Sequence, residues 1–312
     1  MATNMSSEKE EFESINLWER VIAQTNHATN CGALQSIVTK CKLVEDANIK
    51  FLIRILDNFP PKENTEKQEI WQCKNIKKGV NPFLPYEKDL FVTNLSNTHL
   101  CLLNKYNVFD YHLLIITRLF EEQQSWLDLN NFAALCKCLS QIDGLGFYNS
   151  GTLSGASQRH KHLQLVPFPL SSEVENIPIE SIIKKINFQN NVEFISNFKF
   201  SHALTKINFT TENNHFQNAL IMLDNYYKLL RAINLPLRKR KPTVDYNLLI
   251  TRKWMMIIER SQASYESIPI NSLGFAGTFL IKNRKQMEQL KKLTPLKILH
   301  NVAQNREQSI DY

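Results

Sequence analysis

Cysteine is scarce in this sequence, and no two cysteines form a CxxC pair. The 312 residues contain six cysteines. Closely spaced pairs are typical of structural zinc sites, and dense cysteines of disulfide-stapled secreted domains. The simplest interpretation is a set of reduced thiols in a cytoplasmic protein.

Long apolar runs and a recognisable targeting segment are also missing. Residues 1–14, MATNMSSEKEEFES, are polar and acidic, with no apolar core behind a basic stretch. The most apolar stretches, Tyr111–Ile116 and Trp254–Ile258, are short and flanked by charge. Since a bilayer-spanning helix needs about 20 apolar residues, we expect no membrane partner.

The composition is that of an ordinary globular protein. Hydrophobic residues make up 43% and charged residues 21%, and the length suits one large domain or two intimate ones. The 37 basic and 30 acidic residues give a net charge of +7, which favours an anionic partner without identifying it. Nucleic acid is disfavoured because the aromatic residues do not interleave with lysine and arginine as in a single-strand platform.

Hydrophobic periodicity predicts a mixture of helices and short strands, with no fixed-period repeat. The predicted strands are Ala47–Leu56, Leu100–Leu103, His112–Thr117, Tyr246–Thr251 and Trp254–Ile258. Helices are predicted over Ile15–Ala23, from a cap at Asp128 to Gln141, over Phe216–Arg231 and after Asn283. Phe59–Val80 is predicted to be a long surface loop.

This pattern predicts the α+β fold class, with short antiparallel strands and flanking helices. The prediction of a helix over Phe216–Arg231 rests on apolar residues that follow the helical period, namely Phe216, Leu220, Leu223, Tyr227 and Leu230. The two longer helices each lie between strand groups, which suggests two related halves. We place a boundary near residue 200, between an N-terminal region (1–200) and a C-terminal region (201–312).

The residues of greatest chemical interest form the pattern His160-x-His162-x-Gln164. Alternate residues of a strand share a face, so these three side chains are expected on one side, with Lys161, Leu163 and Leu165 on the other. Two imidazoles and an amide on one face need partners, because burying them unpaired is costly.

A loop of small and hydroxylated residues comes directly before this strand. Glycines let backbone N–H groups approach an anion, and hydroxyl groups can donate to phosphate oxygens. The predicted phosphate contacts are Asn149, Ser154, Gly155, Ala156, Ser157 and Gln158.

These two features together predict covalent nucleotidyl transfer. Neutral imidazole is a competent nucleophile near pH 7, and its attack on an α-phosphorus gives a labile phosphoramidate. His162 is the predicted nucleophile, with His160 and Gln164 as its catalytic partners. Two imidazoles on one strand face can also bind zinc, but no CxxC pair or nearby carboxylate completes such a site, so no metal ligands are predicted.

The pattern HxHxQ after SGASQ resembles the diadenosine tetraphosphate phosphorylases, or ATP adenylyltransferases, of the histidine-triad superfamily. Further blocks are similar and in the same order, so the resemblance extends from about residue 45 to about residue 290. They are Lys50 in IKFLIR, Asn81-Pro82-Phe83, Asn104-Lys105, His112–Ile115, Tyr148-Asn149-Ser150 and Leu273–Gly277.

The resemblance implies a fold like that of galactose-1-phosphate uridylyltransferase, with His162 as the nucleophile. It implies reversible phosphorolysis: diadenosine tetraphosphate adenylylates His162 and releases ATP, and phosphate then removes the AMP as ADP. Gln164, where the related hydrolases carry histidine, is typical of the transferase branches. Lys161 and Leu163, where uridylyltransferases typically show Pro and Gly, favour the adenylyl branch.

Other positions are assigned with support from the resemblance. The predicted substrate contacts outside the motif are Lys50, Gly274, Phe275, Ala276, Gly277 and Lys282. Asn104 and His112 are expected to shape the sheet and the nucleotide pocket. No cofactor is certain; a divalent cation such as Mg²⁺ could accompany the polyphosphate.

Two rival functions stay open at this point. The first is a sugar-phosphate uridylyltransferase of the same fold, which would retain a uridylyl group. The second is a nucleotide-binding module without turnover, for which loss of His162 would remove no activity.

Overall fold

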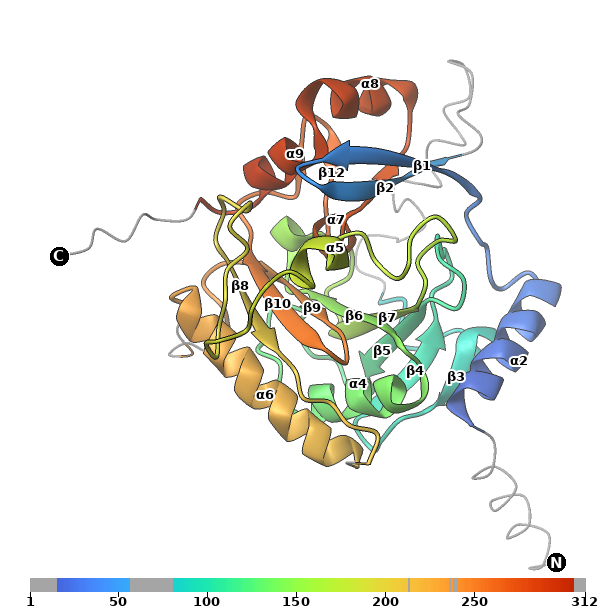
Figure 1. Ribbon diagram of the computed structural model, residues 1–312. Coiled ribbons are helices and arrows are strands. Elements are labelled where there is room, and N and C mark those ends of the chain that lie inside the picture. The colour runs from blue at the N-terminus through green and yellow to red at the C-terminus, as the bar shows by residue number, and fades with distance from the viewer. Residues whose placement is uncertain (1–15, 57–80, 213, 236, 238–240, 306–312) are drawn as a thin grey trace, which may run out of the picture.

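The computed structural model describes residues 16–56, 81–212, 214–235, 237 and 241–305 (Figure 1). The predicted loop Phe59–Val80 therefore lies outside the described residues. An eight-stranded sheet runs through the middle of the protein, and all neighbouring strands in it are antiparallel. Its order is β3 (Phe91–Asn94), β4 (His99–Leu103), β5 (Leu113–Thr117), β7 (His162–Pro167), β6 (Gly144–Asn149), β9 (Tyr246–Ile250), β10 (Trp254–Glu259) and β8 (His202–Lys206).

The topology of the sheet repeats about its centre. Strands β6 and β9 pair in the middle, followed outward by β7 and β5 on one side and by β10 and β8 on the other. Each half has the same chain order: an outer strand, a helix, the central strand and then the strand between them. The two connecting helices are α4 (Leu129–Gln141) and α6 (His215–Ala232). This agrees with the two related halves suggested by the sequence.

One face of the sheet is covered by helices. Helices α4 and α6 pack beside each other on this face, and α2 (Leu17–Asn30) lies near the β3 edge (Figure 1). Leu135 and Met222 from the helices and Leu163 from β7 are fully buried in the same cluster. Asp128 caps α4 as predicted: its side chain accepts from the Asn131 amide at 3.0 Å. The α+β class is confirmed.

A second, three-stranded sheet lies on the opposite side of the protein (Figure 1). It contains β1 (Thr39–Asp46), β2 (Ile49–Leu56) and β13 (Thr278–Ile281), and β13 runs parallel to β2. The remaining elements on this side are α5 (Glu180–Ile183), β11 (Ser264–Tyr265), β12 (Ile268–Pro269), α7 (Ser272–Phe275), α8 (Arg284–Leu293) and α9 (Pro295–Val302). Both larger sheets combine strands from either side of residue 200, and the predicted boundary there stays a prediction.

Helix α6 forms as predicted, and of the apolar residues that follow its helical period Leu230 is buried in the core. Phe216 and Leu220 are 48% and 47% exposed, whereas Ala219, Met222 and Tyr226 are fully buried. The apolar side chains of this helix extend around more than one face, so their spacing supports two phases equally well. Packing against α4 and the sheet selects the phase.

Among the described residues, no helix is both long and apolar enough to cross a membrane.

The phase of α6 predicts unequal costs for two similar truncations. Met222→Ala should lower the free energy of unfolding by about 2–4 kcal/mol, because it leaves a cavity in the core. Leu220→Ala should change it by less than about 0.5 kcal/mol, since this side chain is half exposed. Urea denaturation of both variants measures the difference, and equal losses would contradict the packing described here.

Candidate active site

The histidine motif begins β7, and its side chains alternate between faces as the strand pattern predicts. Leu163 and Leu165 enter the helix-side core. The ammonium of Lys161 contacts Glu121 at 3.0 Å and the Trp126 carbonyl at 2.8 Å. His162 and Gln164 lie on the other face, which carries no large helix.

The imidazole of His162 is held in one tautomer by its own strand. Its Nδ1 lies 2.8 Å from the carbonyl oxygen of His160. Because a carbonyl can only accept, Nδ1 carries the proton and Nε2 keeps a free lone pair. Among the described residues, none forms a hydrogen bond with Nε2. The ring therefore presents the nucleophilic atom to a ligand.

His160 is an anchor and not a second exposed base. Its Nε2–H donates to the Thr117 carbonyl at 2.7 Å, and Nδ1 accepts from the Asn81 amide nitrogen at 2.9 Å. The ring of Phe83 packs edge-on against both imidazoles, with centroids 5.6 Å from His160 and 5.4 Å from His162. Since both nitrogens of His160 are engaged in hydrogen bonds, His160 has no nitrogen left to bind a zinc ion together with His162.

Gln164 is oriented by a chain of two hydrogen bonds from residues in the turn between β4 and β5. The Asn104 amide nitrogen donates to His112 Nδ1 at 3.1 Å, and His112 Nε2–H then donates to Gln164 Oε1 at 2.9 Å. With its oxygen fixed in this way, the amide N–H₂ of Gln164 faces away from His112. Asn104 and His112 thus orient Gln164 by a contact that the sequence pattern did not reveal, and their role in a nucleotide pocket stays a prediction.

Gln123 separates β6 and β7 at the site, and sequence reasoning missed it. The ladder between these strands ends at the pair Phe147 and Gln164. Beyond it, the buried Gln123 amide donates to the Asn149 carbonyl at 2.7 Å and accepts from the His162 amide at 2.8 Å. One side chain therefore replaces the next backbone pairing, and the two strand ends diverge where the nucleophile lies. No spacing rule marks such a residue, which lies 39 positions before His162.

The loop after β6 makes a tight turn, whose first part is the short helix η2 (Thr152–Ser154). Gly155 has φ +92°, and a β-carbon there would lie only 2.7 Å from the Asn271 side chain, so glycine is required. The Ser154 hydroxyl is buried and bonds within the turn, to Gly151. The Asn149 side-chain oxygen accepts from Asn247 at 2.7 Å and from the Ser272 hydroxyl at 2.8 Å.

The predicted phosphate contacts therefore fall into two groups. Ser154 and the oxygen of Asn149 are committed to holding the turn. Gly155, Ala156 and Gln158 are partly exposed, and Ser157 is exposed, so these four are accessible to a ligand. The contact roles themselves stay predictions.

The remaining predicted contacts lie on other elements. Lys50 is exposed on β2, where it pairs across the hairpin with Glu45. The residues of the predicted glycine turn, Gly274, Phe275, Ala276 and Gly277, are all buried. This turn packs against Pro178, and the Gly277 carbonyl accepts a hydrogen bond from the Leu52 amide of β2 at 2.9 Å. Lys282 follows β13 and is partly buried.

A cavity lies beside the site and not at the histidines. It has a volume of about 560 Å³ and borders η2. Its lining residues are Gln124, Thr152, Leu153, Lys241, Pro242, Thr243, Val244, Asp245 and Arg260. The Asp245 carboxylate accepts from the Leu153 amide at 2.7 Å, and Lys241 and Arg260 line the same cavity.

Burial keeps the site histidines neutral. Desolvation lowers the pKa of His162 to about 4, although its bond to the His160 carbonyl acts in the opposite direction. The pKa of His112 is also lowered to about 4 by burial, against the bond to Gln164. Burial lowers the pKa of His160 too. At pH 7 the His162 ring is thus neutral, with Nε2 unprotonated.

Comparison with known protein families identifies the chain. Residues 7–185 match the family described as Ap4A phosphorylase N-terminal domain, which covers more than half of the chain. Residues 196–305 match the ATP adenylyltransferase C-terminal domain. The protein belongs to the Ap4A phosphorylase family. This confirms the family, and with it the class of enzyme, that the sequence predicted.

Relatives from Saccharomyces cerevisiae support this family membership. The chain is 29% identical to diadenosine 5',5'''-P1,P4-tetraphosphate phosphorylase 2 over 238 residues, which cover 68% of this chain and 72% of the yeast protein. It is 27% identical to Protein APA1 over 213 residues, or 58% of this chain and 61% of that protein.

A solved structure of yeast Ap4A phosphorylase Apa2 in complex with Ap4A shares the fold. It aligns with a TM-score of 0.75 at 21% identity, over 94% of this chain and 99% of Apa2. The complex of Apa2 with AMP gives 0.73 at 22% identity, over 95% and 99%. The predicted antiparallel sheet with flanking helices is confirmed by this match.

The buried neutral histidines predict acid sensitivity. Burial also lowers the pKa of His99 to about 4, so three histidines titrate well below the ordinary 6.5. Above pH 6.5 they do not affect stability. As the pH falls from 6.5 towards 4, only the unfolded chain takes up these protons, so stability should fall by up to about 1.4 kcal/mol per pH unit for each histidine.

Urea denaturation at pH 7.5, 6.0 and 5.0 measures this loss. His99→Gln removes one of the three groups and should flatten the pH dependence by about one proton. A stability that is unchanged between pH 6.5 and 5 would contradict the burial of these rings in neutral form.

Proposed function

We propose that this protein catalyses the reversible phosphorolysis of diadenosine tetraphosphate to ATP and ADP through a covalent AMP adduct on His162 Nε2. The observation that carries the proposal is the bond from His162 Nδ1 to the His160 carbonyl, which leaves Nε2 unprotonated and free. The family match and the Apa2 complexes with AMP and Ap4A support the substrate class.

The reaction consists of two displacements. In the first, the Nε2 lone pair forms a bond to the α-phosphorus of one adenylyl group, and the bond to the bridging oxygen breaks, so that ATP leaves. In the second, an oxygen of inorganic phosphate forms a bond to the same phosphorus, the P–Nε2 bond breaks, and ADP leaves. His162 returns to its neutral form, and the kinetics are ping-pong.

The anchored partner of His162 supports both displacements. While the adduct exists, the ring carries a positive charge, and Nδ1–H continues to donate to the His160 carbonyl. This carbonyl is held by a residue whose own ring is fixed at both nitrogens, by Asn81 and Thr117. The charged ring is therefore stabilised without a change in its orientation.

Gln164 supplies a donor to the transferring phosphoryl group. Its oxygen is occupied by His112, so the N–H₂ group is the part that remains for a phosphate oxygen. Ser157, Gln158 and the backbone at Gly155 and Ala156 would hold the phosphates next to it, and Lys50 would bind the far end of the polyphosphate. These roles belong to the proposal.

A divalent cation such as Mg²⁺ would reach the site with its substrate. Among the described residues, no group of three histidine, cysteine or carboxylate ligands stands at the histidine motif. The polyphosphate oxygens would therefore bind the ion, and its chemistry would be to offset their charge.

The adduct is the decisive test. Mixing the protein with diadenosine tetraphosphate in the absence of phosphate should add the mass of one AMP, and adding phosphate should remove it. His162→Gly should form no adduct and lose at least about 10⁴-fold in kcat, yet retain nucleotide binding. Intact mass spectrometry and calorimetry measure these outcomes. An adduct on the Gly variant would contradict His162 as the nucleophile, and a uridylyl adduct from a UDP-sugar would contradict the substrate class.

The chain of hydrogen bonds to Gln164 makes a second, sharper prediction. Gln164→Glu keeps an oxygen for His112 but removes the amide donor and adds a negative charge. We expect kcat to fall about 10²–10³-fold. Gln35→Glu adds the same charge at an exposed position before β1 and should leave kcat unchanged. Steady-state kinetics compare the two, and equal activity would show that Gln164 donates nothing to the transferred group.

A further inference from the structure

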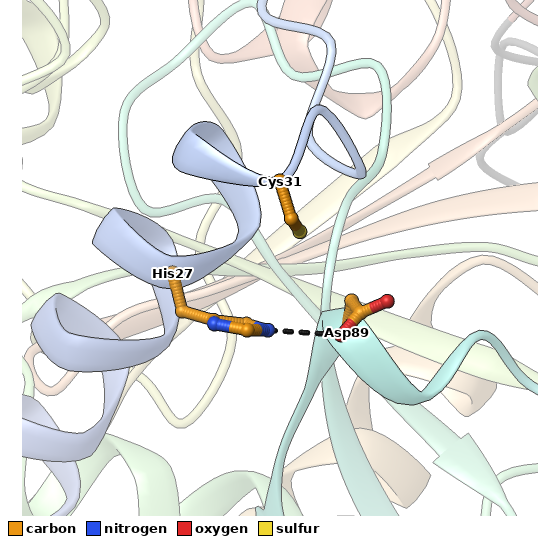
Figure 2. Close-up of side chains that lie close together, drawn as sticks. All are labelled: His27, Cys31 and Asp89. Carbon is orange, nitrogen blue, oxygen red and sulfur yellow. Dashed lines mark hydrogen bonds and ion pairs between the residues drawn. The ribbon is translucent and has the colours of Figure 1, made fainter.

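A cluster of three metal-ligating side chains stands apart from the histidine motif. His27 and Cys31 lie one turn apart at the end of α2, and Asp89 lies in the short helix η1 (Lys88–Leu90) that leads into β3. All three are exposed, and their ligand atoms lie within 4.8 Å of one another. Figure 2 shows the three side chains pointing into a common space, with His27 bonded to Asp89.

We propose that His27, Cys31 and Asp89 bind a zinc ion that fastens the end of α2 to η1. A nitrogen, a sulfur and a carboxylate oxygen match the preferences of Zn²⁺, with water as the fourth ligand. A neutral imidazole, a thiolate and a carboxylate would also balance the charge of the ion. The proton released by the Cys31 thiol passes to the solvent.

The distances require only side-chain movements. Tetrahedral ligands at about 2.0–2.3 Å from zinc lie roughly 3.4–3.6 Å from one another. His27 Nε2 and Asp89 Oδ1 are 2.8 Å apart and must separate slightly, while no separation, all being within 4.8 Å, needs to close by more than about 1.4 Å. Rotation about the side-chain bonds of Cys31 and Asp89 provides these changes.

The backbone on both sides of the cluster is already fixed. The side-chain amide of Gln24 on α2 donates to the backbone carbonyl of Asp89 at 2.6 Å. The backbone N–H of Cys31 donates to the His27 carbonyl at 3.0 Å. Beyond Cys31 the helix end is closed by the bond from Leu34 to Ala28 at 2.9 Å. Because the helix and η1 are held together without the ion, little backbone ordering opposes its binding.

The cluster lies where a bound ion would connect α2 to the segment that packs on the histidines. Six residues before Asp89 stands Phe83, which packs on His160 and His162. The chain between them continues into the edge strand β3. A zinc ion here would therefore tie the N-terminal helix to the segment that covers the histidines.

Zinc and cobalt titration of the full chain, reduced and freed of metal by a chelator, tests the site. We expect one tight Zn²⁺ per chain and a rise in Tm of at least about 2 °C. Co²⁺ in place of zinc should show tetrahedral d–d bands and a thiolate-to-cobalt absorption in the near ultraviolet.

Three variants separate this site from other thiols. Cys31→Ser should abolish the thiolate absorption and weaken Zn²⁺ binding at least tenfold. Asp89→Asn keeps an acceptor for His27 and so preserves the fold, but should weaken binding similarly. Cys41→Ser changes a partly buried thiol of β1 and should leave both signals intact. Absence of stoichiometric binding, or equal binding by Cys31→Ser and the unaltered chain, means an adventitious ion only and overturns the proposal. Neither result bears on His162.

Discussion

The hydrogen bond from His162 Nδ1 to the His160 carbonyl is the interaction on which the site depends. It joins His162, the first residue of β7, to a residue two positions earlier, so the orientation of the His162 ring is set by the adjacent backbone. That backbone is in turn fixed by His160, whose ring reaches Asn81 on one side and Thr117 on the other. Asn81, Thr117 and His160 thus together fix the direction of the Nε2 lone pair of His162.

The site occupies a polar seam between two apolar clusters on the same face of the sheet. Phe83, Leu114 and Ile116 belong to one cluster, and Phe147 and Val166 belong to the other. His162 and Gln164 lie between them, with Gln164 directly across the ladder from Leu114 and Phe147. This placement explains the lowered pKa of His162, because apolar side chains surround the ring and disfavour its charged form.

Much of this arrangement follows from patterns within the sequence. Strand alternation placed His162 and Gln164 on one face, and the cap at Asp128 located the start of α4. Periodicity located α6 but did not show which of its apolar residues face the core, since they extend too far around the helix to define one stripe. Contacts between residues far apart in the sequence could not be predicted from these local patterns. Gln123 bonds to both β6 and β7, and His112 bonds to Gln164, which lies 52 residues later. Both contacts depend on which strands become neighbours, and no local spacing encodes that.

The two halves of the sheet share a topology but not a chemistry. On β10, which corresponds to β7, the residues facing the same side are Trp254, Met256 and Ile258, all buried under the second sheet. That cover is completed by β13, which aligns with β2 although more than 200 residues separate them. The three-stranded sheet is therefore complete only when residues from both ends of the described chain come together. The two family matches cover segments 7–185 and 196–305, yet each of the two larger sheets contains strands from both segments, so neither segment alone can form either sheet.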